Sequence, residues 1–463
     1  MKKILILYGS YGGGHLSAAK SLQNYFETHH KEDIEVKILD CIEYINKYIN
    51  KVSTEAYKEV AKKAPWIWKK IYNNSKDGAL AHLSTTTNKL MSKKLIALLS
   101  EENPDLIIST HPFATQMIAH LKETKKINYR LATVMTDFHI HTQWLVSFEQ
   151  NDFFFVANSQ MKMDMVGLGV DDEKIFVSGI PVGDKFSKKI DTNKVFEEFE
   201  LDKDKKTILF FAGGEFGLGR NKTFMILKAI IRLFPDMQVV AIAGKNKAMK
   251  EKFTELVKNT NSEHRIKILD YTNKVPELMR IACIVITKPG GLTVSESLAS
   301  KKPIIVINPI PGQEEENAEY LINNNVAIRI TDEDNISRTL KYLFKNTENF
   351  NQMVESTKKL SKPNATKTIA EKMYTEVTTK PSPEPIKKEQ KENIIKEIIG
   401  DAKDKIKETN GKIKTTIVSA KDKLEDTIEI AKDKIDIFDL REKIEKAEKN
   451  NTTINKKNNK KED

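Results

Sequence analysis

Residues 284–321 read IVITKPGGLTVSESLASKKPIIVINPIPGQEEENAEYL, and their pattern sets the class of fold. The apolar run 284–286 predicts a buried strand, which the turn KPGG at 288–291 ends. Residues 293–299 then predict a helix, and residues 303–307 predict a second buried strand. Together they form a βαβ unit, the repeating unit of a parallel α/β sheet.

Glycine and polar residues of this unit gather where a parallel sheet binds ligands. Glycines at the turn let a backbone approach a ligand closely, and the following helix N-terminus offers unpaired N–H groups to phosphate. Glu296, in the first turn of that helix, can accept hydrogen bonds from ribose hydroxyls. A polar cluster follows the next strand at the same sheet edge and consists of Gly312, Gln313, Glu316 and Asn317. The unit indicates a nucleotide-sugar site, although Pro-Gly-Gly turns also occur in α/β proteins without phosphate ligands.

The composition limits the class of protein. A chain of 463 residues can hold two or three domains, and its formal net charge of +11 suits an anionic membrane, a nucleic acid or a nucleotide substrate. No run of 18 apolar residues occurs, so the sequence predicts no membrane-spanning helix. We expect a cytoplasmic protein that lies peripherally on the inner face of the cell membrane.

The N-terminal segment repeats the order of strand, glycine turn and helix. Residues 3–7 predict a buried strand, GSYGGGH follows at 9–15, and residues 17–26 predict an amphipathic helix. The spacing differs from GxGxxG, but the glycines leave open space at the helix start, where His15 lies. The helix dipole lowers the pKa of an imidazole at this end and favours its neutral, proton-accepting form. His15 is a candidate catalytic base, with a structural histidine as the alternative.

A tryptophan pair flanked by lysines is a candidate membrane contact. Residues 61–72 read AKKAPWIWKKIY, which places Trp66 and Trp68 between two lysine pairs. Aromatic side chains settle at membrane interfaces, and lysines meet anionic headgroups. Packing of both tryptophans in a core is the alternative. Nucleic acid is not an expected partner, because no further interleaved aromatic and basic residues extend the patch.

Polar residues also follow two further predicted strands, 105–109 and 131–135. Because such residues reach the ligand crevice of a parallel sheet, we expect an acceptor pocket there, with Asp137 as its orienting group or base. The predicted acceptor and membrane-facing residues are Gly13, Gly14, His111, His139, His141, Trp144, Trp66 and Trp68. A zinc site of Asp137, His139 and His141 is the alternative, although no fourth ligand has suitable spacing.

Both halves of the chain alternate strands with helices, and the second half opens with its own glycine loop, AGGEFGLG at 212–219. The further predicted strands are 36–39, 153–157, 175–177, 207–211, 239–243 and 266–269. The pattern predicts an α/β protein of two doubly wound domains that face each other across a cleft. The predicted divisions are an N-terminal domain at 1–185, a C-terminal domain at 186–379 with helices to about residue 375, and a tail at 380–463.

Taken together, these motifs resemble those of one enzyme family. GSYGGGH, TDFHIH with Trp144, FAGGEFGLG and TKPGGLTVSES…PGQEEENAE are similar to motifs of the diacylglycerol glycosyltransferases. That family, in glycosyltransferase family 28, includes bacterial processive diacylglycerol glucosyltransferases and plant monogalactosyldiacylglycerol synthases. It is related to the peptidoglycan N-acetylglucosaminyltransferase. The resemblance covers roughly residues 1–375. It implies two Rossmann-like domains (the GT-B fold), inversion of the anomeric centre, and neither a catalytic metal nor another cofactor.

The resemblance also implies roles for individual residues. His15 falls on the histidine of the family's glycine loop and is the first candidate base, with Asp137 second. The implied donor residues are Gly213, Gly214 and Gly217 around UDP, Gly290, Gly291 and Thr293 at the diphosphate, Glu296 at the ribose, and Gln313 with Asn317 at the hexose. Glu215 departs from the small residue that we expect in many relatives.

The implied reaction moves a hexose from a UDP-hexose to 1,2-diacylglycerol, with glucose preferred over galactose. Whether further hexoses are added to the same lipid is left open. Two alternative functions would give different products in a transfer assay. A UDP-sugar 2-epimerase of the same architecture would need no lipid, and a non-catalytic membrane-surface protein would form no product.

The tail departs from the family pattern. KPSPEP at 380–385 predicts a stiff linker, and Ala-Lys-Asp-Lys recurs at Ala402, Ala420 and Ala431. Gaps of three and four between its apolar positions add up to an 11-residue repeat, which keeps one stripe on a nearly straight helix. The stripe with its flanking lysines suits an anionic membrane surface, with a coiled coil or a solvated helix as the alternatives.

Overall fold

The structure is a computed structural model that describes residues 1–9, 13–45, 95–96, 98–125, 127–212, 220–331 and 335–386. All of these residues belong to one compact unit, Met1–Ile395. Within the described part of the chain, no helix combines the length and the apolar composition needed to cross a bilayer.

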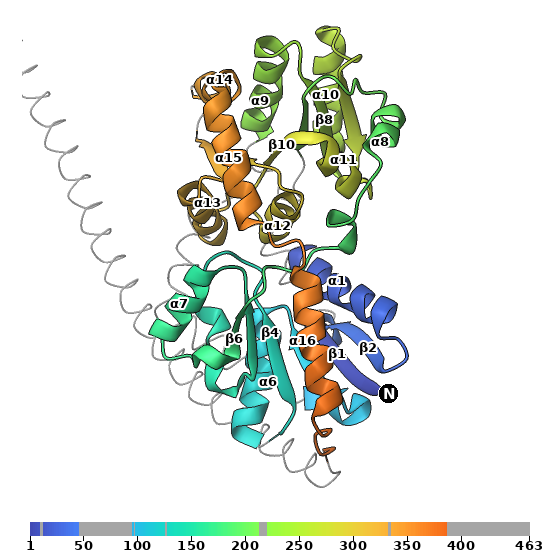
Figure 1. Cartoon of the computed structure of the whole chain (residues 1–463), viewed down its shortest axis with the longest axis vertical. Coiled ribbons are helices and arrows are strands. Elements are labelled where there is room, and N and C mark those ends of the chain that lie inside the picture. Colours follow the sequence, from blue (N-terminus) through green and yellow to red (C-terminus); the bar gives the residue numbers. More distant parts are fainter. Residues whose placement is uncertain are drawn as a thin grey trace, which may run out of the picture. The chain divides into compact units, whose positions relative to one another are not determined.

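The first sheet has six parallel strands in the order β2-β1-β3-β4-β5-β6 (Figure 1). Its strands are β1 (Lys2–Tyr8), β2 (Ile34–Asp40), β3 (Leu106–Ser109), β4 (Arg130–Val134), β5 (Phe153–Val156) and β6 (Ile175–Val177). Its helices are α1 (Gly13–His29), α2 (Cys41–Ile45), α6 (Pro112–Lys125) and α7 (Ser159–Gly167), with short 3-10 turns η1 (Thr142–Trp144), η2 (Phe148–Gln150) and η3 (Asp172–Lys174). Residues 4–7 of β1 are at most 1% exposed, because helices cover both faces of a parallel sheet.

The second sheet also has six parallel strands, in the different order β12-β11-β10-β7-β8-β9, and its strands β8 and β10 are labelled in Figure 1. Its strands are β7 (Thr207–Phe211), β8 (Gln238–Gly244), β9 (Ile266–Asp270), β10 (Ala282–Thr287), β11 (Ile304–Ile307) and β12 (Ala327–Ile330). Turn η4 (Asp184–Phe186) and helix α8 (Thr192–Glu198) lead into it. Its helices are α9 (Arg220–Leu233), α10 (Lys247–Asn259), α11 (Val275–Ile281), α12 (Gly291–Ala299), α13 (Gln313–Asn323), α14 (Ile336–Lys345) and α15 (Thr347–Leu360).

Each sheet has one point where the strand order reverses. In the first sheet β2 and β3 lie on opposite sides of β1, and in the second β8 and β10 lie on opposite sides of β7. Connections that leave in opposite directions open a crevice at the carboxyl ends of the two central strands, which is where such sheets bind ligands. The two parallel sheets confirm the predicted α/β fold of two Rossmann-like domains.

Helix α16 (Ala365–Thr379) packs on the first sheet, although the sequence analysis assigned this segment to the second domain. Its buried side chains are Ile369, Ala370, Met373 and Val377, which join a cluster with residues of β1 and α1. Burying each of the larger ones stabilises the fold by about 1.5–3 kcal/mol. The chain therefore returns to its first sheet after completing the second, and only tertiary contacts reveal this return.

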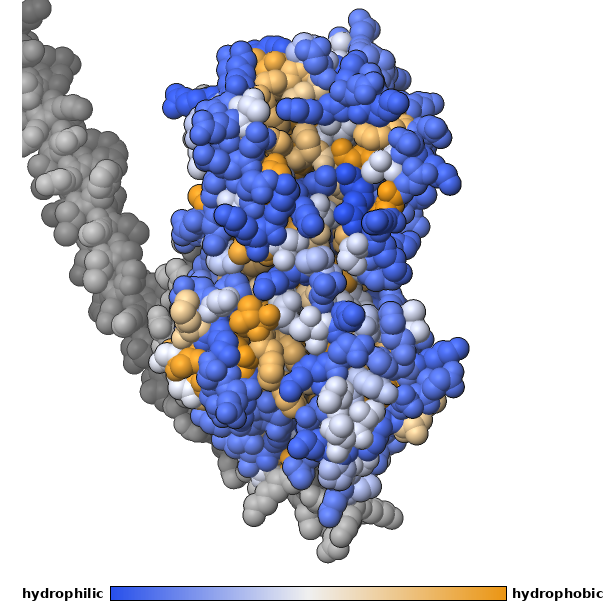
Figure 2. All heavy atoms as spheres, viewed as in Figure 1, coloured by the Kyte–Doolittle hydropathy of each residue, from blue (hydrophilic) through white to orange (hydrophobic). Residues whose placement is uncertain are grey.

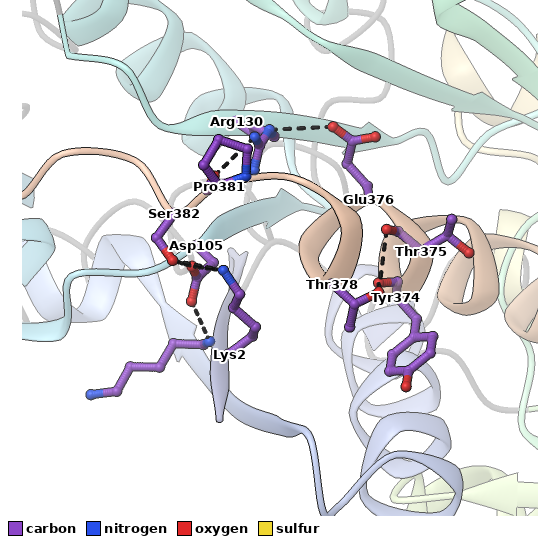
Figure 3. Close-up of polar contacts among 10 residues, drawn as sticks. Lys2, Asp105, Arg130, Tyr374, Thr375, Glu376, Thr378, Pro381 and Ser382 are labelled. Carbon is purple, nitrogen blue, oxygen red and sulfur yellow. Dashed lines mark hydrogen bonds and ion pairs between the residues drawn. The ribbon is translucent and has the colours of Figure 1, made fainter.

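Polar contacts fix the end of α16 and the following segment to the same sheet (Figure 3). Arg130, at the start of β4, forms an ion pair with Glu376 at 3.2 Å and donates to the Pro381 carbonyl at 3.1 Å. Ser382 donates to Asp105, which also accepts from Lys2 at 3.2 Å (Figure 3). Since Lys2, Asp105 and Arg130 lie at strand starts, residue 382 is held at the amino-terminal edge, opposite the ligand crevice.

One buried cluster contains residues of both halves of the chain. Phe138 and Trp144, which follow β4, pack in it with Val294 and Leu298 of α12. This shared core places the segment after β4 beside the helix that follows the KPGG turn.

Candidate active site

The two glycine turns of the predicted site lie next to each other. Helix α1 begins at Gly13 after β1, and α12 begins at Gly291 after β10. A Cβ placed on Gly14 would lie 3.9 Å from the Cβ of Leu292, so the starts of the two helices approach closely. Each helix start carries unpaired N–H groups and partial positive charge. Two such ends close together form a favourable environment for an anion such as a diphosphate.

His15 is held in one tautomer by its neighbours. Its Nδ1 lies 2.6 Å from the carbonyl oxygen of Thr110, which follows β3. A carbonyl oxygen only accepts, so Nδ1 carries the proton and Nε2 keeps a lone pair. The Thr136 hydroxyl lies 3.1 Å from the same Nδ1, and Thr110 Oγ1 donates to the His15 carbonyl at 3.0 Å. Burial lowers the pKa of His15 to about 4, so the ring is neutral at neutral pH. This is the state that a general base requires.

His111 supports His15 from the side. Its ring centroid is 4.5 Å from that of His15 in an edge-on arrangement, and it is only 4% exposed. The backbone N–H of Phe113 donates to its Nδ1 at 3.2 Å. Burial and the proximity of His15 hold the pKa of His111 well below its usual value. Two adjacent neutral imidazoles are thus present, of which His15 sits at the start of α1.

The KPGG turn makes a close backbone contact that only glycine permits. A Cβ on Gly291 would lie 1.9 Å from the carbonyl oxygen of Thr136, whereas a Cβ on Gly290 would meet nothing nearer than Glu314 Oε1 at 3.9 Å. Thr136 also contacts His15, so this approach brings the start of α12 beside the candidate base. Thr293, the third predicted diphosphate residue, lies in the first turn of α12.

Glu296 is a half-buried carboxylate in α12. It is the sixth residue of the helix and so lies in the second turn, not in the first as predicted. It accepts no hydrogen bond from any residue that the structure describes, and burial raises its pKa to about 8. An unpaired buried carboxylate is costly unless hydrogen-bond donors reach it. Vicinal ribose hydroxyls are donors of this kind.

Asp137 is bound by two side chains of α13. Gln313 Nε2 donates to its Oδ2, and Asn317 Nδ2 donates to its Oδ1 at 3.3 Å. Burial raises the pKa of Asp137 to about 6, and these two donors oppose the increase. The carboxylate thus joins the segment after β4 to the helix that was predicted to bind the donor hexose.

The side-chain amide of Asn317 forms its hydrogen bonds with other protein groups. It is 1% exposed, and its Nδ2 also donates to the Pro289 carbonyl at 3.1 Å. Its Oδ1 accepts the backbone N–H of Phe138 at 2.9 Å. In this arrangement its amide hydrogens go to Asp137 and Pro289 and are not available to a hexose. Asn317 therefore joins Asp137 to the KPGG turn, and the partly exposed Gln313 stays a predicted hexose contact.

The other predicted acceptor residues occupy three different environments. His139 is exposed, and its Nδ1 lies 3.4 Å from Glu316 Oε2. His141 Nδ1 accepts the backbone N–H of Gln143 at 3.3 Å and in this way caps the start of η1. Trp144 is 1% exposed, with its ring centroid 6.4 Å from that of His15, so it forms part of the core behind the base. Among the described residues, no three His, Cys, Asp or Glu side chains are grouped to hold a metal ion.

Several predicted residues lie outside the described part of the chain. They are Gly213, Gly214 and Gly217 of the second glycine loop, Trp66 and Trp68, and the tail from residue 387. Their predicted roles remain predictions.

Two contacts of the base were missed by the sequence analysis. Thr110 and Thr136 both hold His15 Nδ1, and each lies at the end of a strand, immediately before a residue that was chosen. Their position at strand ends was the available signal. Which of two adjacent polar residues faces the base depends on backbone direction, which the sequence does not specify.

Comparisons with known proteins place both halves of the chain. The family model for monogalactosyldiacylglycerol (MGDG) synthase matches residues 15–182, and the model for glycosyl transferases group 1 matches residues 191–360. Processive diacylglycerol beta-glucosyltransferases of Bacillus cereus and Bacillus mycoides are each 33% identical over 390 residues, covering 83% of this chain and 96% of theirs.

Solved structures share the fold at low identity. The S. aureus MnaA–UDP co-structure has a TM-score of 0.55 at 17% identity and covers 83% of this chain and 100% of its own. Acinetobacter baumannii MurG has a TM-score of 0.55 at 12% identity, covering 81% and 99%. Fold and site together define a UDP-sugar-dependent glycosyltransferase built of two Rossmann-like domains. The chain belongs to the family of processive diacylglycerol β-glucosyltransferases.

Proposed function

We propose that this enzyme transfers a hexose from a UDP-sugar to the hydroxyl of 1,2-diacylglycerol and inverts the anomeric centre. Glucose is the proposed donor sugar, because the bacterial relatives are named as glucosyltransferases. Further hexoses are then added to the first product, as the word processive in those names implies for the relatives. The observation that carries the proposal is the fixed, neutral His15 beside the start of α12.

The proposed step uses His15 as general base. The acceptor oxygen attacks the anomeric carbon on the face opposite UDP, and its proton passes to His15 Nε2. A new C–O bond forms while the bond from the anomeric carbon to the diphosphate breaks, and its electron pair leaves with UDP. General base catalysis of this kind contributes about 10²–10⁴-fold. Thr110 keeps the other ring nitrogen protonated, which aims the lone pair of Nε2 away from the carbonyl.

The start of α12 is the proposed binding region for the leaving group. Its N–H groups, with those at the start of α1, stabilise charge that develops on the diphosphate. Glu296 accepts from the ribose hydroxyls and Gln313 contacts the hexose. Because peptide dipoles supply this positive field, we propose that the reaction needs no catalytic metal, so transfer should persist in excess EDTA.

We further propose that the enzyme works at the inner face of the cell membrane. The acceptor is a membrane lipid, and the formal net charge of +11 favours an anionic surface. Trp66 and Trp68 are the proposed docking residues, and replacing both with alanine should weaken binding to phosphatidylglycerol vesicles.

Labelled donors test the function directly. The protein is incubated with UDP-[¹⁴C]glucose or UDP-[¹⁴C]galactose and diacylglycerol vesicles, and products are separated by thin-layer chromatography. Labelled glycolipid from UDP-glucose, with a β linkage by NMR, supports the proposal, and products with further sugars support successive rounds. Conversion of the UDP-sugar without acceptor would indicate an epimerase instead, and no product with either donor would contradict a catalytic role.

A further inference from the structure

A cavity, the connector pocket, lies beside the two segments that join the sheets. Its volume is about 660 Å³. Gly179 and Ile180 line it from the segment after β6, Lys359 and Leu360 from the end of α15, and Lys362 from the segment that joins α15 to α16. None of its lining residues belongs to the predicted donor, acceptor or catalytic set. The connector pocket is therefore a different site from the one described above.

The two connecting segments touch each other at the pocket wall. Gly179 has φ +86°, in the region that favours glycine, and a Cβ there would lie 2.6 Å from the Cβ of Lys362. Nearby, Thr366 Oγ1 donates to the Val182 carbonyl at 2.6 Å in a buried hydrogen bond. An occupant of the pocket would consequently contact both connections between the sheets.

The polar part of the lining suits an anion. Lys359 and Lys362 are exposed and form no ion pair with a described residue, and no carboxylate is among the described residues that line the cavity. Asn158 and Ser159, at the start of α7, also line it, and Asn158 Oδ1 accepts the backbone N–H of Met161 at 2.9 Å. Free lysines beside a helix N-terminus attract phosphate or carboxylate groups.

Apolar side chains form another part of the lining, and they continue to the surface. Phe138 stacks on Tyr320 with ring centroids 5.5 Å apart, and Leu298 and Leu360 complete this side. Met163 and Val166 follow Ser159 on the same face of α7 and are 59% and 42% exposed. Figure 2 shows hydrophobic side chains at the surface in the region of α7. An apolar chain could therefore extend from the pocket along α7.

Phe138 links the connector pocket to the active site. Its N–H donates to Asn317, which holds Asp137, and its carbonyl accepts from Asn158 Nδ2 at 2.9 Å. A ligand packed against Phe138 thus rests on the loop that carries Asp137.

We propose that the connector pocket binds an anionic amphiphile, a phosphate or carboxylate group carried on an apolar chain. Lys359 and Lys362 select the charged end, and the Phe138 side of the lining with the apolar face of α7 takes the chain. The proposal stands apart from hexose transfer, because the binding measurement needs neither donor nor acceptor.

Octyl phosphate titrated into the full chain by calorimetry tests the pocket. We expect one site, and Lys359→Gln with Lys362→Gln should weaken its affinity about tenfold or more through loss of charge-assisted contacts. The control is Lys252→Gln with Lys258→Gln, which removes the same charge from exposed positions of α10 and should leave the affinity unchanged. Equal affinity in all three proteins, or an equal loss in both variants, would overturn the proposal.

Two further probes examine each part of the ligand, and vesicles identify its source. Inorganic phosphate and octyl glucoside should each bind at least about tenfold more weakly than octyl phosphate, because each lacks one recognised part. If either bound equally well, the amphiphile assignment would be wrong. Loss of binding to phosphatidylglycerol vesicles only in the Lys359/Lys362 variant would assign a membrane lipid. Retained vesicle binding with lost octyl phosphate binding would assign a soluble amphiphile.

Discussion

The starts of α1 and α12 have the same local plan but different chemistry. Both follow a central strand of a parallel sheet through a glycine turn at the point where strand order reverses. At α1 the helix start carries His15, an imidazole with one nitrogen tied to Thr110. At α12 the corresponding turn carries no base, but Gly291 approaches Thr136 closely and Glu296 stands unpaired among the described residues one turn further on.

This difference suggests a division of labour between two copies of one motif. A proton acceptor needs a neutral ring with a free lone pair, and a leaving-group site needs exposed N–H groups with a hydroxyl acceptor nearby. Because the α1 and α12 starts are adjacent, the proposed base and the proposed leaving-group site can face the same anomeric carbon. Substitutions at the two helix starts should accordingly produce different defects.

The largest effect is expected from His15→Ala. Loss of the base should lower the rate of glucose transfer by about 10²–10⁴-fold, measured as initial rates with UDP-[¹⁴C]glucose. His29→Ala, an exposed histidine at the other end of α1, is the matched control and should retain the wild-type rate. Near-normal turnover of the His15→Ala enzyme would contradict this role and make Asp137 the candidate base.

Gly291→Ala should weaken UDP binding at the start of α12. Its new methyl would lie 1.9 Å from the Thr136 carbonyl, so the backbone must move and the helix start must separate from His15. Overpacking of this kind costs about 1–3 kcal/mol, and we expect UDP affinity and transfer to fall together by about tenfold or more. Gly167→Ala, where a Cβ would meet nothing within 4 Å, should be neutral. Unchanged UDP affinity in Gly291→Ala would show that the contact does not shape the donor site.

Glu296→Gln should remove a pH dependence of UDP binding. The pKa of Glu296 is raised to about 8, so its carboxyl is largely protonated below that pH and ionised above it. Only the ionised form accepts from both ribose hydroxyls, so UDP affinity should rise as pH increases through 8. The glutamine variant should bind about tenfold more weakly on the alkaline side and show a flat profile. A wild-type profile without this rise would argue against ribose at Glu296.

The smallest expected effect is a fall in the rate of transfer when Asp137 becomes protonated at low pH. His15 has a pKa of about 4, so it stays neutral well below its ordinary titration range, whereas Asp137 gains a proton below about pH 6. Protonation should weaken the contacts of Asp137 with Gln313 and Asn317 and lower transfer by about twofold to tenfold. Asp137→Asn should remove this step. A step near pH 6 that survives in the variant would belong to another group.

The sequence predicted the strands well because most of them, above all the central ones, are buried in their sheets. Of the twelve strands in the described part of the chain, eleven coincide with predicted apolar runs, among them β1 and β10. The exception is β12, a four-residue edge strand whose sequence AIRI contains a partly exposed arginine. The return of α16 to the first sheet was also missed, since its apolar face does not indicate which sheet it covers.

The sequence predicted that the candidate site residues would lie near one another, but it did not predict their contacts. His15, Asp137 and the KPGG turn do come together, because their positions at strand ends place them at the same sheet edges. The engagement of Asn317 by Asp137 and Pro289, and the burial of Trp144, depend on packing between segments far apart in the chain. Periodicity and spacing carry no information about such contacts.

Titration of UDP into the His15→Ala protein, beside its rate of glucose transfer to diacylglycerol, tests the division of labour most directly. We predict UDP affinity within about twofold of the wild type together with the loss of transfer, as expected for a group that acts only in the transition state. A parallel fall of UDP affinity and transfer would show that His15 holds the nucleotide and would contradict its role as the base.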